Sequence, residues 1–448
     1  LDLKSSKKTI QTLISNWIDN NHKYNSLNWN LDILSKRIIA WISNSKITYE
    51  NSDEIYKEKF DGLIQKQINH LKNEIDRSEW IDDKMIGCSA IILGGLAYNE
   101  KEKFLNYGLN LLKKIIKFSF DKEGFPKSRD IRQLNFYLKY FILIREWLKE
   151  SQNEIPEYLD EAIFHLGQSY FLIHKNIDKT FLFNGNNTSE NFEFENYLKR
   201  LGYNFKNENN ETGGYIIFKN KKFALGMDIG STPNRKFSNN YQSGALSFEI
   251  ITNNKKLICN SGYFQNYKHQ LNSISKTTAC HSTLSIGNYS SVQFEKQFEG
   301  QTKIASLLKI FDKKIISEKN YWSVSASHDG YNKRFGIIHN RKIDFFHDFQ
   351  KFVGVDTILK KKKFKSTIFE IRFHLDPNSK VMKTQDGKTI YIDLNNEGWK
   401  FISKEYKIDI ETGFFFGLKN NFVENQNIVI SGIVQNEKQK INWTIEKI

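Results

Sequence analysis

The chain of 448 residues and 52.7 kDa is long enough for two or three domains, each able to bury its own hydrophobic core. Hydrophobic residues at 39 % and charged residues at 26 % exclude a disordered or fibrous protein, and only three cysteines exclude a disulfide framework. The 66 Lys and Arg residues outnumber the 51 Asp and Glu residues, and this net charge of +15 favours either a polyanionic partner or a compositional bias toward Lys, Asn and Ile.

The first 180 residues have apolar side chains at helical spacing, with glycines and prolines between the apolar stretches. The clearest helical stretches are residues 32–42, 105–118 and 134–148. The longest apolar run, residues 88–98, is far shorter than the ~20 residues that a membrane-spanning helix needs. We therefore expect a helical domain over residues 1–180, with short loops and no transmembrane segment.

Beyond residue 180 the pattern changes to short strands separated by turns. Residues 214–227 contain two apolar runs around an Asn-Lys turn, which is typical of a β-hairpin. Further strands are predicted over residues 246–252, 256–260, 283–286, 335–338, 368–374, 389–392 and 427–433. Because no helical runs separate these strands, residues 181–448 are predicted to form an antiparallel β-sandwich, and the polar, Asn-rich residues 184–210 lie at the junction.

The sequence leaves the compartment and the oligomeric state open. The chain begins with Leu1 rather than Met, so we expect that preceding sequence with any signal peptide is missing, and both the bacterial periplasm and the cytoplasm remain alternatives. Lysine runs such as residues 360–363 are more often solvated surface than binding sites, and no nucleic-acid-binding or phosphate-binding motif occurs. A nucleic acid is therefore not the expected partner.

Eight segments, read in order along the chain, share the pattern of one known family. They are Trp41–Ser45, Gly124–Arg129, Gly244–Glu249, Leu257–Gly262, Thr278–Leu284, Ser327–Tyr331, Ile371–Pro377 and Gly398–Trp399. Together they resemble the heparinase II/III-like family, in particular its alphaproteobacterial branch. The resemblance implies an N-terminal α/α toroid-like helical domain followed by a C-terminal antiparallel β-sandwich, in agreement with the change of periodicity.

The same resemblance implies a polysaccharide lyase that acts on an acidic, uronate-containing glycan. Elimination removes the proton on C5 of the uronate, and this carbon becomes acidic only when hydrogen-bond donors neutralise the neighbouring carboxylate. A base, usually Tyr or His, accepts the proton, and an acid protonates the leaving oxygen. A basic groove would attract the polymer, and aromatic side chains would stack on its sugar rings.

The chain departs from the family pattern in both halves. A His-x-His-x-Asp stretch is replaced here by residues 240–244, and the positions that hold zinc in the family correspond to Gln242, Asn260 and His281. One imidazole with two neutral amides is a poor set of zinc ligands, so we predict no structural zinc and no other cofactor. In the helical half, Arg132 occupies the place of the family's catalytic tyrosine, and Tyr137 lies one to two turns further along as a substitute.

The candidate site residues fall into a catalytic and a substrate-binding group, each with a structural alternative. Tyrosines 241, 263 and 267 lie near one strand end, where they could supply a phenol or simply pack their rings. The arginines could bind a carboxylate or sulfate, or pair with Asp130 or Glu123. The predicted catalytic residues are His281, Gln242, Tyr241 and Tyr137, and the predicted substrate-binding residues are Arg129, Arg132, Asn240, Asn260 and Tyr267.

Two functions follow from these observations. The first is cleavage of an acidic polysaccharide by β-elimination, in which His281, Gln242 and the arginines position the uronate. The second is a non-catalytic acidic-glycan-binding or assembly protein on the same fold, which the missing His, Asp and Tyr positions favour. The retained histidine and the positive charge do not distinguish the two.

Overall fold

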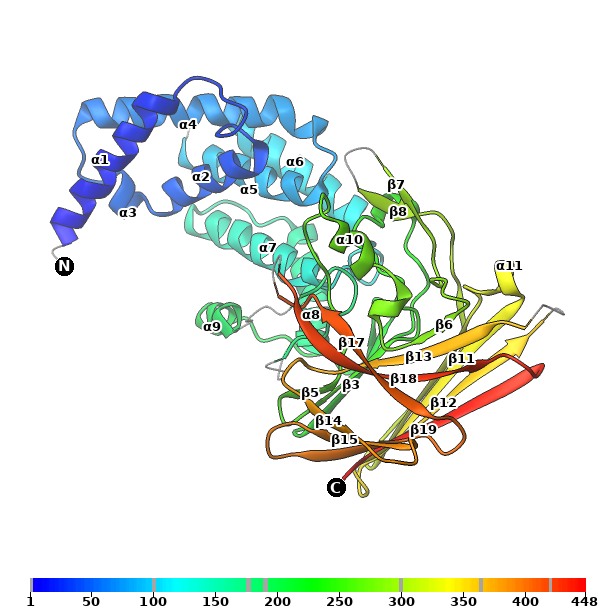
Figure 1. The fold of residues 1–448 in the computed structure, drawn as a ribbon. Helices are drawn as coiled ribbons and strands as arrows, with labels where there is room; N and C mark the ends of the chain where they lie inside the picture. The colour runs from blue at the N-terminus through cyan, green and yellow to red at the C-terminus, as the bar shows by residue number, and fades with distance from the viewer. Residues whose placement is uncertain are drawn as a thin grey trace. The chain divides into compact units, whose positions relative to one another are not determined.

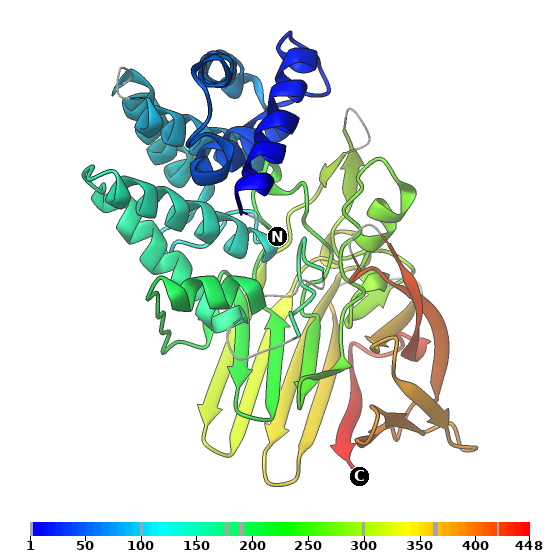
Figure 2. The same ribbon diagram turned by 90° about the vertical axis from the view of Figure 1, so that its left-hand side faces the viewer.

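The structure of the chain is a computed structural model that describes residues 3–98, 102–174, 179–187, 192–297, 301–361, 366–418 and 421–448. The first part is helical and the second consists of antiparallel sheets, as the periodicity predicts (Figure 1, Figure 2). The chain divides into two compact units, residues 1–121 with 136–166 and residues 122–135 with 167–448. We call them the helical unit and the sheet unit. A domain boundary at residue 180 stays a prediction.

The helices of the first part follow one another with short connections, and three of them contain the stretches predicted from periodicity. Their bounds are α1 (Leu3–Asn21), α2 (Leu31–Ser43), α3 (Ser45–Thr48), α4 (Glu54–Glu74), α5 (Ile81–Ala97), α6 (Glu102–Ser119), α7 (Arg132–Glu150), α8 (Glu157–His174) and α9 (Phe192–Arg200). Polar side chains cap two of the helix starts, since Asn30 accepts a hydrogen bond from the backbone N–H of Asp32 and Asp53 accepts one from that of Tyr56.

Helix α5 forms the interior of the helical unit. Every residue from Met85 to Gly95 is buried, and the helix packs against α2, α4 and α6. A side chain at Gly94 would lie 2.2 Å from the Cδ1 atom of Ile68, so this glycine lets α4 and α5 approach closely. The apolar run at residues 88–98 is thus mostly an inner helix, and none of the described helices is long and apolar enough to cross a membrane.

The second part contains short strands with two short helices among them. The strands are β1 (Glu211–Thr212), β2 (Tyr215–Lys219), β3 (Phe223–Asp228), β4 (Phe248–Thr252), β5 (Lys255–Ile258), β6 (Leu284–Ile286), β7 (Phe294–Lys296), β8 (Thr302–Ile304), β9 (Ile310–Glu318), β10 (Tyr321–His328), β11 (Ile337–Phe346), β12 (Lys351–Lys360), β13 (Ile368–His374), β14 (Lys380–Lys383), β15 (Thr389–Asp393), β16 (Gly398–Ile402), β17 (Ile408–Phe415), β18 (Val423–Ile433) and β19 (Lys438–Lys447). The short helices are α10 (Gln270–Ser275) and α11 (Asn332–Phe335).

All strand pairs in the described residues are antiparallel. One sheet has the order β1-β2-β3-β4-β5, a second has the order β14-β15-β16-β19-β12-β11-β10-β9, and a third has the order β17-β18-β13-β6. Strands β2 and β3 form the predicted hairpin, with Tyr215 opposite Asp228. The strand predicted at residues 335–338 begins only at Ile337, because α11 extends to Phe335 and Gly336 caps this helix in the left-handed conformation, with a φ of 61°.

Aromatic side chains join the first two sheets into a sandwich. The rings of Phe218 on β2 and Trp322 on β10 stack with their centroids 5.4 Å apart, and those of Phe248 on β4 and Trp443 on β19 stack at 5.3 Å. A side chain at Gly354 would lie 2.0 Å from the indole of Trp443, so the glycine makes room for this ring. The second part is therefore the predicted antiparallel β-sandwich.

A buried ionic network lies inside the sandwich. The Asp356 carboxylate accepts hydrogen bonds from Arg341 Nε at 2.8 Å and from Trp443 Nε1 at 2.8 Å, and its Oδ1 lies 2.6 Å from His339 Nε2. His339 Nδ1 in turn lies 3.2 Å from His328 Nε2. Burial alone would raise the pKa of Asp356, but Arg341 and His339 lower it well below its usual range.

The buried histidines predict that the protein loses stability in mild acid. Burial lowers the pKa of His281 to about 4 and those of His174 and His374 to about 3, and it also lowers the pKa values of His328 and His339. The unfolded chain therefore binds protons below about pH 6.5 that the folded protein does not, which costs about 1.4 kcal/mol per pH unit for each histidine.

We expect the urea midpoint, followed by tryptophan fluorescence, to fall steeply between about pH 6.5 and 4 and to be nearly constant from about pH 7 to 8. The low pKa of Asp356 adds a further loss below about pH 4. A midpoint that did not change from pH 7 to 5 would contradict the burial of neutral histidines.

Candidate functional site

Arg129 is anchored in the interior of the sheet unit. Its side chain is 9 % exposed and its Nη2 lies 2.6 Å from Asp228 Oδ1, whose side chain is 2 % exposed. The remaining N–H groups donate to backbone carbonyls: those of Gly213 at 3.0 Å, Gly214 at 3.2 Å, Gly230 at 3.0 Å and Ser231 at 3.3 Å. A guanidinium has five N–H donors, so Arg129 has none left for a glycan.

Glycines make this anchoring sterically feasible. A side chain at Gly230 would lie 2.3 Å from the Cζ atom of Arg129, and one at Gly214, which has a φ of 78°, would lie 3.1 Å from Nη2. Arg129 itself has a φ of 60°, a conformation that is uncommon for residues other than glycine. The contacts of its side chain hold the backbone in this conformation.

A polar cluster forms around the next residue, and we use this name for Asp130, Arg132, Asn240 and Tyr263. Asp130 Oδ2 accepts hydrogen bonds from Asn240 Nδ2 at 2.9 Å and from Arg132 Nη2 at 3.3 Å, and Oδ1 accepts one from the backbone N–H of Arg132 at 2.9 Å. The Tyr263 hydroxyl donates to Asn240 Oδ1 at 3.1 Å. Asp130 is 1 % exposed, whereas the Arg132 side chain is 30 % exposed, so Arg132 is the solvent-facing member.

The environment of Tyr263 keeps its phenol protonated at neutral pH. Burial raises the pKa of Tyr263 above that of a free phenol. The Asn272 amide and Arg132 oppose the rise, and the Asp130 carboxylate adds to it. Tyr263 can therefore donate a proton, but its ionised form is disfavoured.

Lys276 is a buried cation beside this cluster. Its ammonium group donates to the hydroxyl of Thr302 at 2.7 Å and to the backbone carbonyl of Asn239, and it lies 5.9 Å from the ring centroid of Tyr263. It has no ion pair with the carboxylates in the described part of the chain, and burial lowers its pKa to about 7. The sequence offers no indication of this role, because the residue stands in a polar stretch.

Gln242 links three backbone segments of the sheet unit. Its amide nitrogen donates to the carbonyls of Gly262 at 3.1 Å and Ser275 at 2.7 Å, and its oxygen accepts from the N–H of Gly185 at 3.1 Å. The side chain is fully buried. These bonds indicate that Gln242 positions the loop that carries Asn240.

Asn260 has a comparable place at the end of β5. Its oxygen accepts a hydrogen bond from the backbone N–H of Ser282 at 2.9 Å, and its nitrogen donates to Glu249 Oε1 at 3.1 Å. Glu249 also forms a buried ion pair with Lys256 at 2.8 Å. Asn260 therefore connects a buried ionic pair to the strand that follows His281.

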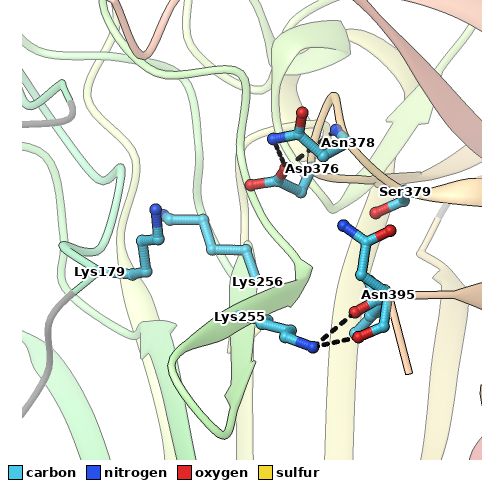
Figure 3. A pocket seen from close by; sticks show the side chains of 8 residues that line it. Lys179, Lys255, Lys256, Asp376, Asn378, Ser379 and Asn395 are labelled. Atoms are coloured by element: carbon cyan, nitrogen blue, oxygen red, sulfur yellow. Dashed lines mark hydrogen bonds between the residues drawn. The ribbon is translucent and has the colours of Figure 1, made fainter. Parts of the chain in front are cut away.

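Lys256 also lines a polar cavity of about 150 Å³ in the sheet unit, together with Lys179, Lys255 and Asp376 (Figure 3). The ammonium group of Lys255 donates to the backbone carbonyl of Leu394 at 2.8 Å, and that of Lys256 is paired with Glu249. Two of the three lysines are thus committed to partners of the fold, and Asp376 adds a negative charge to the same lining. The cavity is consequently not a strong site for anions.

The imidazole of His281 is buried, and only one of its two ring nitrogens is hydrogen-bonded to the described residues. Its Nδ1 lies 2.8 Å from the carbonyl oxygen of Thr277, so Nδ1 carries the proton and Nε2 the lone pair. Nε2 has no hydrogen-bond partner in the described residues, and it faces the backbone of Gly244 together with the unpaired hydroxyl of Ser247. Burial lowers the pKa of His281 to about 4, so the ring is neutral at pH 7.

The residues at the family's zinc positions do not fit a zinc ion. The side-chain oxygens of Gln242 and Asn260 already accept hydrogen bonds from backbone N–H groups. Of the possible zinc ligands at these three positions, only Nε2 of His281 has no partner among the described residues. Within the described ranges no group of three or more His, Cys, Asp or Glu side chains could hold a metal.

The predicted tyrosines lie in three different environments. Tyr241 is buried beside Asp228 and Arg129, and its hydroxyl makes no hydrogen bond of ordinary geometry in the described residues. Tyr137 is fully buried in the helical unit, 3.4 Å from Asp82 Oδ1. Tyr267 is half-buried, with the ammonium group of Lys268 5.9 Å from its ring. Of the nine predicted residues, the structure brings Arg132 and Asn240 together in the polar cluster.

One family model and several solved structures are similar to this chain. The family model described as Heparinase II/III-like, C-terminal, matches residues 208–444. A crystal structure of heparinase III is similar over 100 % of this chain and 74 % of that chain, with a TM-score of 0.77 and 16 % identity. Heparan sulfate lyase HepC from Pedobacter heparinus is similar over 100 % of this chain and 73 % of that chain, with a TM-score of 0.72 and 14 % identity. The search of curated proteins found no match.

The two arginines near the cluster should differ sharply in their effect on stability. Arg129→Met leaves Asp228 buried without its partner, so we expect the free energy of unfolding to fall by about 3–5 kcal/mol. Arg132→Ala removes a partly exposed partner of the buried Asp130, which keeps its hydrogen bonds from Asn240 and from a backbone N–H, so the loss should be smaller, about 1–2 kcal/mol. Urea unfolding of both variants tests this, and equal losses would contradict the distinct roles.

Proposed function

Because the chain belongs to the heparinase II/III-like family, we propose that it cleaves a uronate-containing acidic glycan by β-elimination, with the polar cluster as part of its site. The proposal is supported by the match over residues 208–444 and by a net charge of +15. The observation that carries it is the cluster itself, which combines a solvent-facing guanidinium, an amide and a protonated phenol within one unit.

Arg132 is proposed to neutralise the uronate carboxylate. Guanidinium groups match a carboxylate in a bidentate manner, and charge-assisted hydrogen bonds of this kind are roughly twice as strong as neutral ones. The Asp130 carboxylate orients the Arg132 side chain through a hydrogen bond. The same carboxylate accepts a hydrogen bond from the Asn240 amide and so holds this amide near Arg132. Neutralisation allows negative charge to spread from C5 onto the carboxylate in the transition state.

Tyr263 is proposed as the acid that protonates the leaving oxygen. Its raised pKa keeps the proton in place until the glycosidic oxygen develops charge. His281 is proposed as the proton acceptor, since its Nε2 has a lone pair and its ring is held by the carbonyl of Thr277. Gln242, Asn260 and Tyr241 then serve as positioning residues, and the roles of Tyr137 and Tyr267 stay predictions.

A second candidate is glycan binding without cleavage. The pKa of about 4 makes His281 a weak base, and its side chain is only 1 % exposed. A weak, enclosed base is a poor match for the proton on C5 of a uronate. This observation favours a protein that binds a carboxylate through Arg132 but does not carry out the elimination.

The two candidates are separated by incubating the protein with heparan-type, alginate-type and glucuronan-type polymers and following the ultraviolet absorbance of a new unsaturated uronate. A rise in absorbance that His281→Ala abolishes would support elimination. A flat trace with measurable binding of one polymer would favour the non-catalytic protein. Neither cleavage nor binding of any polymer would refute both candidates.

The Tyr263→Phe variant should lose cleavage but retain binding. The substitution keeps the ring and removes the acidic proton, so we expect kcat to fall by about 10²–10⁴-fold while KM changes little. Its free energy of unfolding should fall by only about 1 kcal/mol, the contribution of the hydrogen bond to Asn240. A variant with unchanged kcat would exclude Tyr263 as the acid.

The Arg132→Ala variant should bind the polymer more weakly. Loss of a charge-assisted hydrogen bond is worth about 1.5–3 kcal/mol, so we expect the Kd for the acidic polymer to rise by roughly 10- to 100-fold and to depend less on salt. The matched control is Arg145→Ala in the helical unit, because the Arg145 side chain is 27 % exposed and also pairs with aspartate. Equal effects of the two variants would indicate a contribution of net charge alone.

A further inference from the structure

A second cavity of about 330 Å³ lies in the sheet unit, between the C-terminal part of α8 and α9 with the segment that follows it. Its size lies within the range of small-ligand pockets in proteins. Four of its lining residues are aromatic, namely Tyr170, Phe171, Tyr203 and Phe205. None of them belongs to the polar cluster or to the residues predicted from the sequence.

The aromatic walls are fixed by packing. A side chain at Gly167 would lie 2.1 Å from the ring of Phe205, so this ring is seated directly on the backbone of α8. The rings of Tyr203 and Phe205 lie 5.9 Å apart, and Tyr170 meets Phe194 edge-on at 5.5 Å. A pocket with such supported walls is formed before any ligand arrives.

The polar groups of this pocket are few and one of them has no partner. Tyr170 is 2 % exposed, and its hydroxyl makes no hydrogen bond to the described residues. Burial and the nearby Glu195 carboxylate raise the pKa of Tyr170, so its hydroxyl keeps a proton to donate. Glu195 and Lys199 supply one negative and one positive charge to the same lining.

We propose that this pocket binds one neutral pyranose unit of a glycan. The C–H face of a sugar ring packs against aromatic walls, while its hydroxyls need both a donor and an acceptor, which Lys199 and Glu195 provide. A purely apolar ligand would displace water from Glu195 and Lys199 without replacing its hydrogen bonds. A uronate or sulfated unit would gain no net attraction, because Glu195 offsets Lys199. The inference goes beyond the proposed function, since binding here requires no cleavage.

The test uses isothermal titration of the full chain with short neutral oligosaccharides, one series built of N-acetylglucosamine and one of glucose. We expect one series to bind, Tyr203→Ala to abolish the binding, and Glu195→Ala to raise the Kd by about tenfold. The melting temperature of Glu195→Ala should be nearly unchanged, because this side chain is partly exposed and forms no ion pair with the described residues. Tyr391→Ala, at an exposed tyrosine on β15, is the control and should bind like the unmodified protein.

Three results would overturn the proposal. They are the absence of binding by both series, binding that neither pocket variant alters, and binding of an apolar naphthalene dye that Tyr203→Ala removes while no sugar binds. In a separate titration, the Kd for acidic polymers is compared between the unmodified protein and Arg132→Ala. Loss of neutral-sugar binding alone then counts against the pocket, and loss of acidic-polymer binding alone counts against the proposed function.

Discussion

The buried pairing of Arg129 with Asp228 is the interaction on which the polar cluster depends. A guanidinium is costly to bury, and here one carboxylate and four backbone carbonyls compensate for the lost water. The carbonyls can converge only because Gly214 and Gly230 have no side chains. Asp130 follows Arg129 directly, so the same anchoring places the carboxylate that orients the rest of the cluster.

The two amides at the family's zinc positions hold backbone segments together through hydrogen bonds. Gln242 and Asn260 each donate and accept, which an amide does at any pH, whereas an ionised carboxylate only accepts and an imidazole loses its acceptor when it is protonated. Each amide thereby joins backbone segments that are distant in sequence. His281 is bonded to the carbonyl of Thr277, so hydrogen bonds hold the side chains at all three positions.

The periodicity of the sequence predicts the helices and the strands, but the sequence predicts only part of the candidate site. Helical spacing and short apolar runs depend on local sequence, so the helices, the first hairpin and strands such as β13 lie where the pattern predicts. Arg129 and Arg132 are the same residue type three positions apart, yet one is buried in the fold and the other faces solvent. Sequence does not reveal that difference, nor the burial of Lys276, because both arise from segments brought together only by folding.

In the function that we propose, cleavage of the glycan rather than binding alone depends on how far Arg132 compensates for the low basicity of His281. Burial moves the pKa of Tyr263 upward and that of His281 downward, so each group is biased toward its neutral form. A neutral phenol suits the acid step, and a neutral imidazole of low basicity hinders the proton abstraction. The acidity of the uronate C5 proton rises with neutralisation of its carboxylate. If the guanidinium binds this carboxylate closely, a weaker base is sufficient for elimination. If it binds the carboxylate only loosely, His281 is too weak a base, and the protein binds the glycan without cleaving it.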